Sequence, residues 1–304
     1  MNRKLRSLSI IIFGGVLLAS LSGCNTGQKT NDDAVKEKVL VSTGDTSATR
    51  IVKLNNTLFS VPSPYQTAIF IQNQGVPYSK DKLNDVRKTS SYDGSFYAAA
   101  NLGVFGADLG YITLYEQSPD AMSYFSVIKM LAEKLELLGA FDRATIERIE
   151  NNINNQDSLL TILGDTYRNA DSYFKDNERE HLAGLVIAGG WIESMYLLVN
   201  IADANSAQSA KRIGENKKPL DNLIQLLAPY AGTSAQYQKL ADLLIDLAGI
   251  YEQVDIDYEF ITTETDPDKK MTIVKTKTNI KIEQAVVTEI AEQLNKIRTF
   301  IVRG

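Results

Sequence analysis

Residues 98–117 read AAANLGVFGADLGYITLYEQ, and the glycines in this stretch constrain how the chain can fold. Ala99, Gly103, Gly106 and Gly110 recur at spacings of four, three and four, which places them on one face of a helix. A glycine inside a helix costs about 1 kcal/mol relative to alanine, so three of them require a compensating reason. Either another helix approaches this face closely, which small residues allow, or a ligand lies against it. We favour close helix packing.

A second stretch has the same character and is the natural partner of the first. Residues 181–198 read HLAGLVIAGGWIESMYLL, with Gly184 and Ala188 four residues apart and Gly189 and Gly190 following directly. Both stretches are apolar almost all round, which is typical of helices buried at the centre of a fold. We therefore expect these two helices to pack against each other.

Outward from this pair, helical periodicity continues from about residue 60 to the end of the chain. Proline near the first turn, glycine after the last turn and apolar stripes mark the boundaries. The predicted helices are 64–74, 94–117, 121–138, 143–153, 156–175, 178–204, 220–230, 235–254 and 282–302, with Gly75 and Gly139 as stops. Residues 205–219 are expected to form a loop with at most one helical turn. The expected fold is mainly α, a single irregular bundle of about 8–10 helices over 51–304.

One region departs from the helical pattern. Residues 256–280 are rich in threonine, isoleucine, valine and tyrosine, and Asp266, Pro267 and Asp268 separate two such runs. This composition predicts a small β-hairpin with a loop of several residues. The alternative is that the first run extends the preceding helix and the remainder is loop.

The N-terminus has the pattern of an export signal. Arg3, Lys4 and Arg6 precede an apolar run over 8–19 that is too short to span a membrane. The run ends in Leu-Ser-Gly-Cys at 21–24, which resembles the lipobox of bacterial lipoproteins. We expect residues 1–23 to be cleaved between Gly23 and Cys24, and Cys24 to be acylated and held in a lipid bilayer. The alternative is an ordinary secretory signal with a chance cysteine.

The residues after Gly23 indicate how the folded body is attached and on which side of the membrane it lies. Residues 24–50 are polar, and we expect a flexible tether with one short ordered piece around Val39–Val41. Asn25, rather than aspartate, directly after the cysteine resembles an outer-membrane sorting signal, and we favour the periplasmic face. The acidic residues of Asn31-Asp32-Asp33 leave cell-surface exposure open.

Charge and composition exclude several functions. The 304 residues carry a net charge of −5, and loss of the three cations of the leader makes it −8, which argues against nucleic acid as a partner. One cysteine and one histidine exclude a cysteine-rich or multi-histidine metal centre within the chain. The motifs GxSxG, GxxxxGK[ST], GxGxxG and CxxCH are missing. We expect no catalytic residues, no metal and no cofactor.

Each central helix carries one acid in apolar surroundings, Asp108 in the first and Glu193 in the second. Buried acids must be paired, hydrogen-bonded or protonated. We favour two separate acids with local partners. The alternative is a carboxylate pair in a cleft, fit for acid–base chemistry or a cation, with Tyr111 and Trp191 as further candidate ligand contacts. For Trp191, we favour a core anchor over a platform for a sugar.

The stretch from Tyr92 to Gln117, together with AGGWIESMYL over 188–197, resembles a family of uncharacterised, mostly helical lipoproteins of Gram-negative bacteria. The resemblance implies a helical body and a lipid anchor, and it supplies no active site. The resulting hypothesis is a non-enzymatic scaffold or binding module with envelope proteins as possible partners. The rival hypothesis is a ligand-binding or enzymatic body with a polar pocket around Asp108 and Glu193.

Overall fold

The computed structural model describes most of the chain from residue 40 onward. The described residues are 40–42, 49–54, 57–137, 143–152, 155, 158, 162, 179–203, 206–266 and 271–303. The chain divides into residues 1–38 and a body over 39–304. The predicted leader, Cys24, most of the predicted tether and nearly all of the helix predicted over 156–175 lie outside the described residues.

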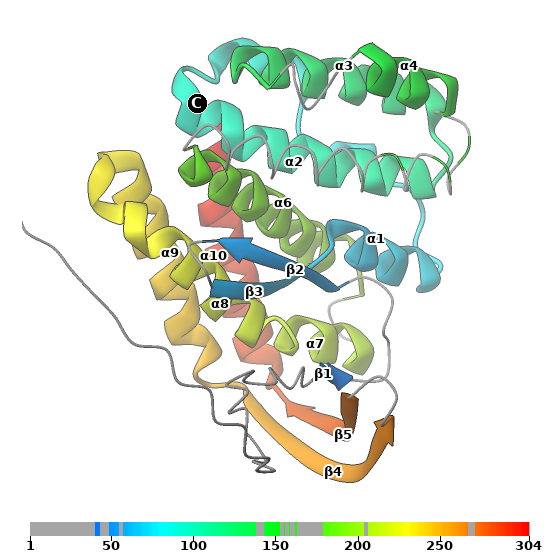
Figure 1. The fold of residues 1–304 in the computed structure, drawn as a ribbon, viewed down its shortest axis with the longest axis vertical. Coiled ribbons are helices and arrows are strands. Elements are labelled where there is room, and N and C mark those ends of the chain that lie inside the picture. Colours follow the sequence, from blue (N-terminus) through cyan, green and yellow to red (C-terminus); the bar gives the residue numbers. More distant parts are fainter. Residues whose placement is uncertain are drawn as a thin grey trace, which may run out of the picture. The chain divides into compact units, whose positions relative to one another are not determined.

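The body is mainly α, as predicted, with nine α-helices within the described ranges. The two glycine-rich stretches form α2 (Gly94–Leu114) and α6 (Glu180–Ile201), which pack extensively against each other. Helix α3 (Ser118–Lys134) covers the other side of α2, so α2 lies between α3 and α6 (Figure 1). Helices α1 (Pro64–Asn73) and α10 (Gln284–Val302) both contact α2 and α6. The predicted central pair is therefore confirmed.

Two glycines explain why α2 and α6 approach so closely. A Cβ atom built on Gly103 would lie 2.0 Å from the carbonyl oxygen of Val186, and one built on Gly189 would lie 1.9 Å from that of Ala100. Any larger residue at either position would collide with the backbone of the other helix. Gly110, on the same face of α2, has no such neighbour within 4 Å. The predicted close packing of the two helices is confirmed. It depends on the one point where α2 and α6 cross, and not on every small residue along this face of α2.

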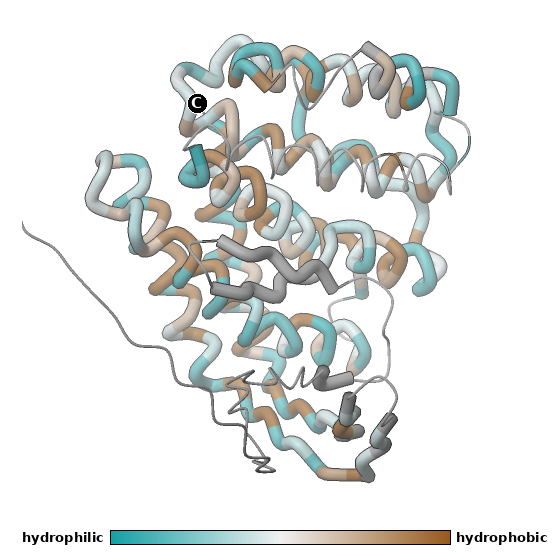
Figure 2. The backbone as a smooth tube through the Cα atoms, in the orientation of Figure 1, coloured by the Kyte–Doolittle hydropathy of each residue, from teal (hydrophilic) through white to brown (hydrophobic). Residues whose placement is uncertain are grey.

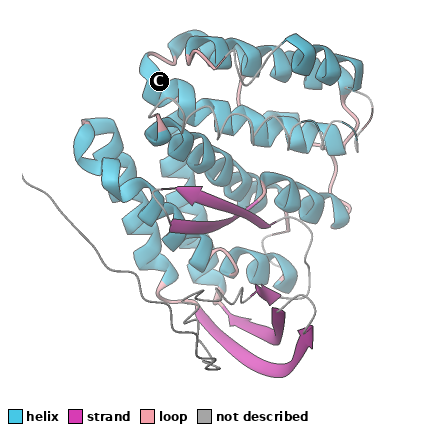
Figure 3. Ribbon diagram, viewed as in Figure 1, coloured by secondary structure: helices cyan, strands magenta, loops and turns pink. Residues whose placement is uncertain are grey.

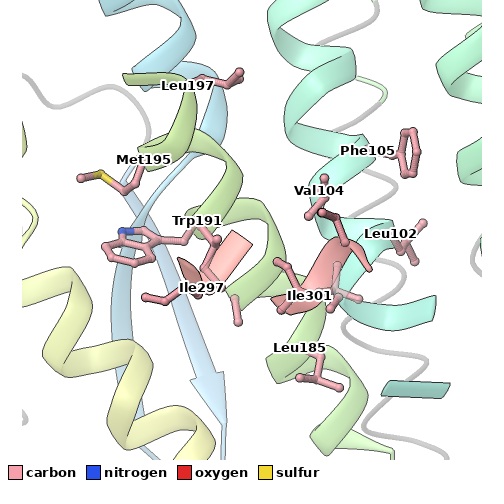
Figure 4. Packing of buried hydrophobic residues seen from close by; sticks show 14 of the residues in the cluster. Leu102, Val104, Phe105, Leu185, Trp191, Met195, Leu197, Ile297 and Ile301 are labelled. Carbon is pink, nitrogen blue, oxygen red and sulfur yellow. The ribbon is translucent and has the colours of Figure 1, made fainter. Parts of the chain in front are cut away.

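Large side chains fill the space on either side of this crossing. Figure 4 shows Phe105 on the side of α2 that faces away from α6, and Trp191 on the side of α6 that faces away from α2. Both side chains are almost completely buried. Helix α6 is long and apolar enough to cross a membrane, but 89% of its apolar window is buried inside the body. It is thus the core helix of this bundle.

The C-terminal half of the body adds helices with a single apolar stripe. Helix α8 (Lys217–Leu227) leads through the 3₁₀ turn η3 (Ala228–Thr233) into α9 (Ala235–Tyr251). The predicted stripes are buried, namely Leu240, Leu243, Leu244, Leu247, Tyr251 and Val254 around α9, and Val286, Ile290, Leu294, Ile297 and Ile301 on α10. Figure 2 shows hydrophobic and hydrophilic residues alternating along these helices, as expected for elements with one face in the core.

The predicted hairpin is confirmed. Strand β4 (Asp255–Asp266) pairs antiparallel with β5 (Met271–Lys281), and β1 (Leu40–Ser42) adds a parallel strand beyond β5 (Figure 3). A second hairpin, which we did not predict, joins β2 (Thr49–Leu54) to β3 (Thr57–Pro62). Strand β1 matches the ordered piece expected near residue 40, while the start of β2 also falls inside the range predicted as tether.

Many helix ends differ from the prediction by two or three residues, and two differences have a clear local cause. The segment 205–219, predicted as a loop with at most one helical turn, contains the helix α7 (Ala207–Gly214). Ser206 caps this helix by accepting two N–H groups of the first turn, and its apolar residue Ile213 is completely buried. This segment has few apolar residues, so its helical periodicity is weak. One buried contact and a cap are nevertheless enough to stabilise a short helix.

The other difference concerns the end of α3. This helix ends at Lys134 rather than at Gly139, because Glu136 has a left-handed φ of 58° and the N–H of Leu137 bonds back to the carbonyl of Ala132. Helix α4 (Arg143–Asn152) follows and agrees with the helix predicted over 143–153.

The connection from α1 to α2 consists of two 3₁₀ turns, η1 (Lys80–Lys82) and η2 (Val86–Ser91). Residue Asn84, between these turns, is almost fully buried. This connection therefore contributes polar groups to the interior of the body.

Candidate functional site

Helices α2 and α6 bring Asp108 and Glu193 together in the interior. Neither side chain is exposed to solvent, and the two carboxyl groups lie close enough for the charge of Glu193 to raise the pKa of Asp108. Each acid has a partner of its own, as the favoured prediction expected: Glu193 binds an arginine and Asp108 binds a backbone N–H. The two acids are nevertheless neighbours, and in that respect they agree with the alternative of a carboxylate pair, although they are enclosed rather than set in an open cleft.

Arg298 of α10 completes this cluster. Its Nε donates to Oε2 of Glu193 at 2.7 Å and its Nη2 donates to Oε1 at 2.8 Å, a bidentate ion pair. The guanidinium lies 3.9 Å from the centre of the Tyr196 ring, and Nη2 also reaches the carbonyl oxygen of Lys82. The arginine side chain is only 12% exposed. Arg298 thereby places a cation against both oxygens of the Glu193 carboxyl group.

Asp108 is connected to a second set of buried polar groups. Its Oδ2 accepts the backbone N–H of Asn84 at 3.0 Å. The side-chain amide of Asn84 donates to the hydroxyl of Tyr92 and to Oδ1 of Asn101, and the backbone carbonyl of Asn84 accepts the hydroxyl of Tyr124. This network ties the connection between η1 and η2 to α2 and α3.

The surroundings of Asp108 and Arg298 shift the pKa of each group. Burial raises the pKa of Asp108 well above its ordinary value, and the neighbouring charge of Glu193 raises it further. Burial opposes the charge on Arg298, but the Glu193 carboxylate outweighs burial and raises the pKa of the guanidinium. Oδ1 of Asp108 has no hydrogen-bond partner in the protein.

The remaining sequence-predicted candidates do not join this cluster through hydrogen bonds. Tyr111 accepts the N–H of Ser79 at 3.1 Å and stacks on Tyr78. Trp191 is 2% exposed and donates its indole N–H to Asn216 at 3.1 Å. Trp191 is thus a core anchor, the interpretation that we favoured from the sequence. None of the four candidate ligand contacts reaches solvent.

Arg298 was not singled out in the sequence, although one signal for it exists. It follows Ile297 directly and lies four residues after Leu294, both on the buried stripe of α10. A cation at the border of an apolar stripe requires a buried acid as partner. The partner lies 105 residues earlier in the chain, so only the folded structure identifies it.

Two clefts lie at the surface near the N-terminus of α2. The first has a cavity volume of about 460 Å³ and is lined by aromatic rings, among them Phe96, Tyr97, Tyr230, Tyr237 and His181. The hydroxyl of Tyr237 donates to the carbonyl of His181 at 2.9 Å. Partial burial, and next the charge of Arg179, lower the pKa of His181, which favours the neutral imidazole. We term these residues the aromatic cleft.

The second cleft lies between α9 and α10 and has a cavity volume of about 610 Å³. We term it the cationic cleft, because three of its lining residues are basic and none is acidic. Its lining consists of Tyr97, Lys239, Leu243, Asn295, Lys296, Thr299, Phe300 and Arg303. Tyr97 lines both clefts, so they adjoin. Asp108 and Glu193 line neither of them.

Comparison with known proteins finds no matching family model, curated protein or solved structure. Within the described ranges, no group of three histidine, cysteine, aspartate or glutamate side chains is arranged to hold a metal ion.

Proposed function

We propose that this protein is a lipid-anchored, non-enzymatic binding module of the bacterial cell envelope, attached through Cys24 to the outer membrane and facing the periplasm. The observation that carries the proposal is the sequence Leu-Ser-Gly-Cys at 21–24 behind a basic segment and an apolar run, with Cys24 as the only cysteine in the chain. A thiol at this position is the acceptor that a lipobox requires.

The arrangement of the body supports a binding role rather than catalysis. The one acid pair that could perform acid–base chemistry has no exposed surface, and its charge is compensated by Arg298. A general acid or base must come within hydrogen-bond reach of the proton that it transfers, and these carboxyl groups contact only the protein. The acids and the arginine instead tie α2, α6 and α10 together.

The clefts at the surface are where a partner can make contact. Both have volumes within the range of ligand sites, and both combine aromatic surface with polar groups. A body tethered by an acylated N-terminus needs no membrane-binding face of its own, which leaves these clefts available to soluble molecules or envelope proteins.

Membrane fractionation of the Cys24→Ser variant tests the anchor. We expect wild type to sediment with the outer membrane and to carry acyl chains on the N-terminal peptide by mass spectrometry, whereas Cys24→Ser loses the acyl mass and leaves the membrane fraction. Ser22→Ala is the matched control, because it keeps a small residue in the lipobox and leaves anchoring intact. If Cys24→Ser remains in the membrane fraction like wild type, the proposed attachment is wrong.

A further inference from the structure

We propose that the cationic cleft between α9 and α10 binds a small soluble anion that carries two or more negative charges next to a flat ring. This inference deepens the proposed binding role by naming a ligand class. It does not depend on the lipid anchor, because the anchor is tested by fractionation and the cleft by titration.

The first argument is the charge of the lining. Lys239 comes from α9, and Lys296 and Arg303 come from the C-terminal part of α10 and its cap. All three are exposed, and none forms an ion pair within the part of the chain that the structure describes. Three unpaired cations around one cavity, in a chain with net charge −5, produce a local positive potential that attracts a multivalent anion.

The second argument is the placement of the nearest acids on the same helices. Asp242, one turn after Lys239, accepts the side-chain amide of Gln238 at 2.8 Å. On α10, Glu292 lies one turn before Lys296, and Glu289 accepts the side-chain amide of Gln253 at 3.2 Å. None of these three acids lines the cleft, and among the described residues none forms an ion pair with Lys239, Lys296 or Arg303.

The third argument is the shape and chemistry of the cavity. Tyr97, Phe300 and Leu243 supply apolar surface next to the cations, and the rings of Tyr97 and Phe300 lie 6.2 Å apart between centroids. Asn295 and Thr299 add an amide and a hydroxyl. An apolar surface with a few polar groups is the usual composition of a small-molecule site, and a volume of about 610 Å³ holds a ligand with one or two rings.

Isothermal titration of the full chain in non-ionic detergent tests this proposal, with inorganic pyrophosphate and adenosine diphosphate as probes. We expect saturable binding of both probes, weakening as salt is added. The triple variant Lys239→Gln/Lys296→Gln/Arg303→Gln should weaken both by at least about tenfold, since each cation supplies a direct charge contact. Phe300→Leu should weaken the nucleotide more than pyrophosphate, because only the nucleotide presents a ring.

A matched variant separates local from overall charge. Lys88→Gln/Lys218→Gln/Lys277→Gln removes three exposed lysines outside the cleft and should bind both probes as wild type does. Equal weakening by the two triple variants, or no saturable binding by wild type, would overturn the proposal. So would binding only to vesicles of anionic lipid with none to the soluble probes. Unchanged melting temperatures of the variants establish that they remain folded.

Discussion

Substitution of Gly103 by alanine tests the crossing of α2 and α6 directly. The new Cβ would lie 2.0 Å from the carbonyl oxygen of Val186 and 2.7 Å from the backbone nitrogen of Gly190. Both neighbours are backbone atoms of one helix, so no side chain can rotate aside. To reach the 3.4 Å at which contact becomes ordinary, α6 must move by roughly 1.4 Å.

That displacement would disturb the largest interface of the body. Overpacking of a core typically costs about 1–3 kcal/mol and occasionally more, and a clash with backbone belongs at the upper end of this range. Alanine regains about 1 kcal/mol through its higher helix propensity. We therefore expect Gly103→Ala to lower the free energy of unfolding by about 2 kcal/mol, and the melting temperature by on the order of 4–8 °C.

Gly110→Ala is the matched control, because it makes the same change on the same face of α2. A Cβ there meets nothing within 4 Å, so only the propensity gain remains and the variant should be about 0.5–1 kcal/mol more stable than wild type. Urea unfolding followed by circular dichroism measures all three proteins. If Gly103→Ala is as stable as Gly110→Ala, the close crossing of α2 and α6 does not require glycine at position 103.

Three further predictions concern the interior. Arg298→Met leaves the charge of Glu193 buried without its cation and should destabilise the protein by about 3–5 kcal/mol, whereas the double variant with Glu193→Gln should recover most of this loss in urea unfolding. A double variant no more stable than the single one would contradict the assigned ion pair. Asp108→Asn should flatten the pH dependence of the free energy of unfolding. In wild type, the folded state keeps the Asp108 proton above the ordinary pKa of 3.8, whereas the unfolded state loses it. Wild type therefore loses stability as pH rises past that value, and the variant does not. A stability difference between them that is constant from pH 4 to 8 would contradict the raised pKa. The fluorescence of Trp191, the only tryptophan, should be blue-shifted and poorly quenched by iodide until denaturant is added, and easily quenched emission from the native protein would contradict its burial.

The sequence was sufficient for the central architecture because the relevant signals are local. Glycine spacing in α2 and α6 predicted their contact, and the stripes of α9 and α10 predicted which faces are buried. The hairpin of β4 and β5 followed from composition and from a proline-containing loop. For helix α7 the sequence predicted one turn at most, because the segment is short and polar and is stabilised by a cap and one buried contact.

The acid cluster was predictable only in part, for a physical reason. That Asp108 and Glu193 need partners follows from their apolar neighbours in the sequence. Which partners they have depends on the angle and register at which three helices meet. Asn84, in an irregular connection, and Arg298, near the end of the chain, have no periodic relation to either acid, and only the three-dimensional fold brings them to it.

The same helix connects the closed interior to the open cleft. On α10, Arg298 points inward to Glu193, while Lys296, Thr299 and Phe300 line the cationic cleft. The bidentate ion pair therefore fixes the rotation of α10 about its axis, and with it the positions of the cleft residues one or two places away. Catalysis would require the acid pair to open, whereas a preformed binding surface requires it to stay closed. Through α10, the buried ion pair is therefore linked to the positions of the residues that line the cationic cleft.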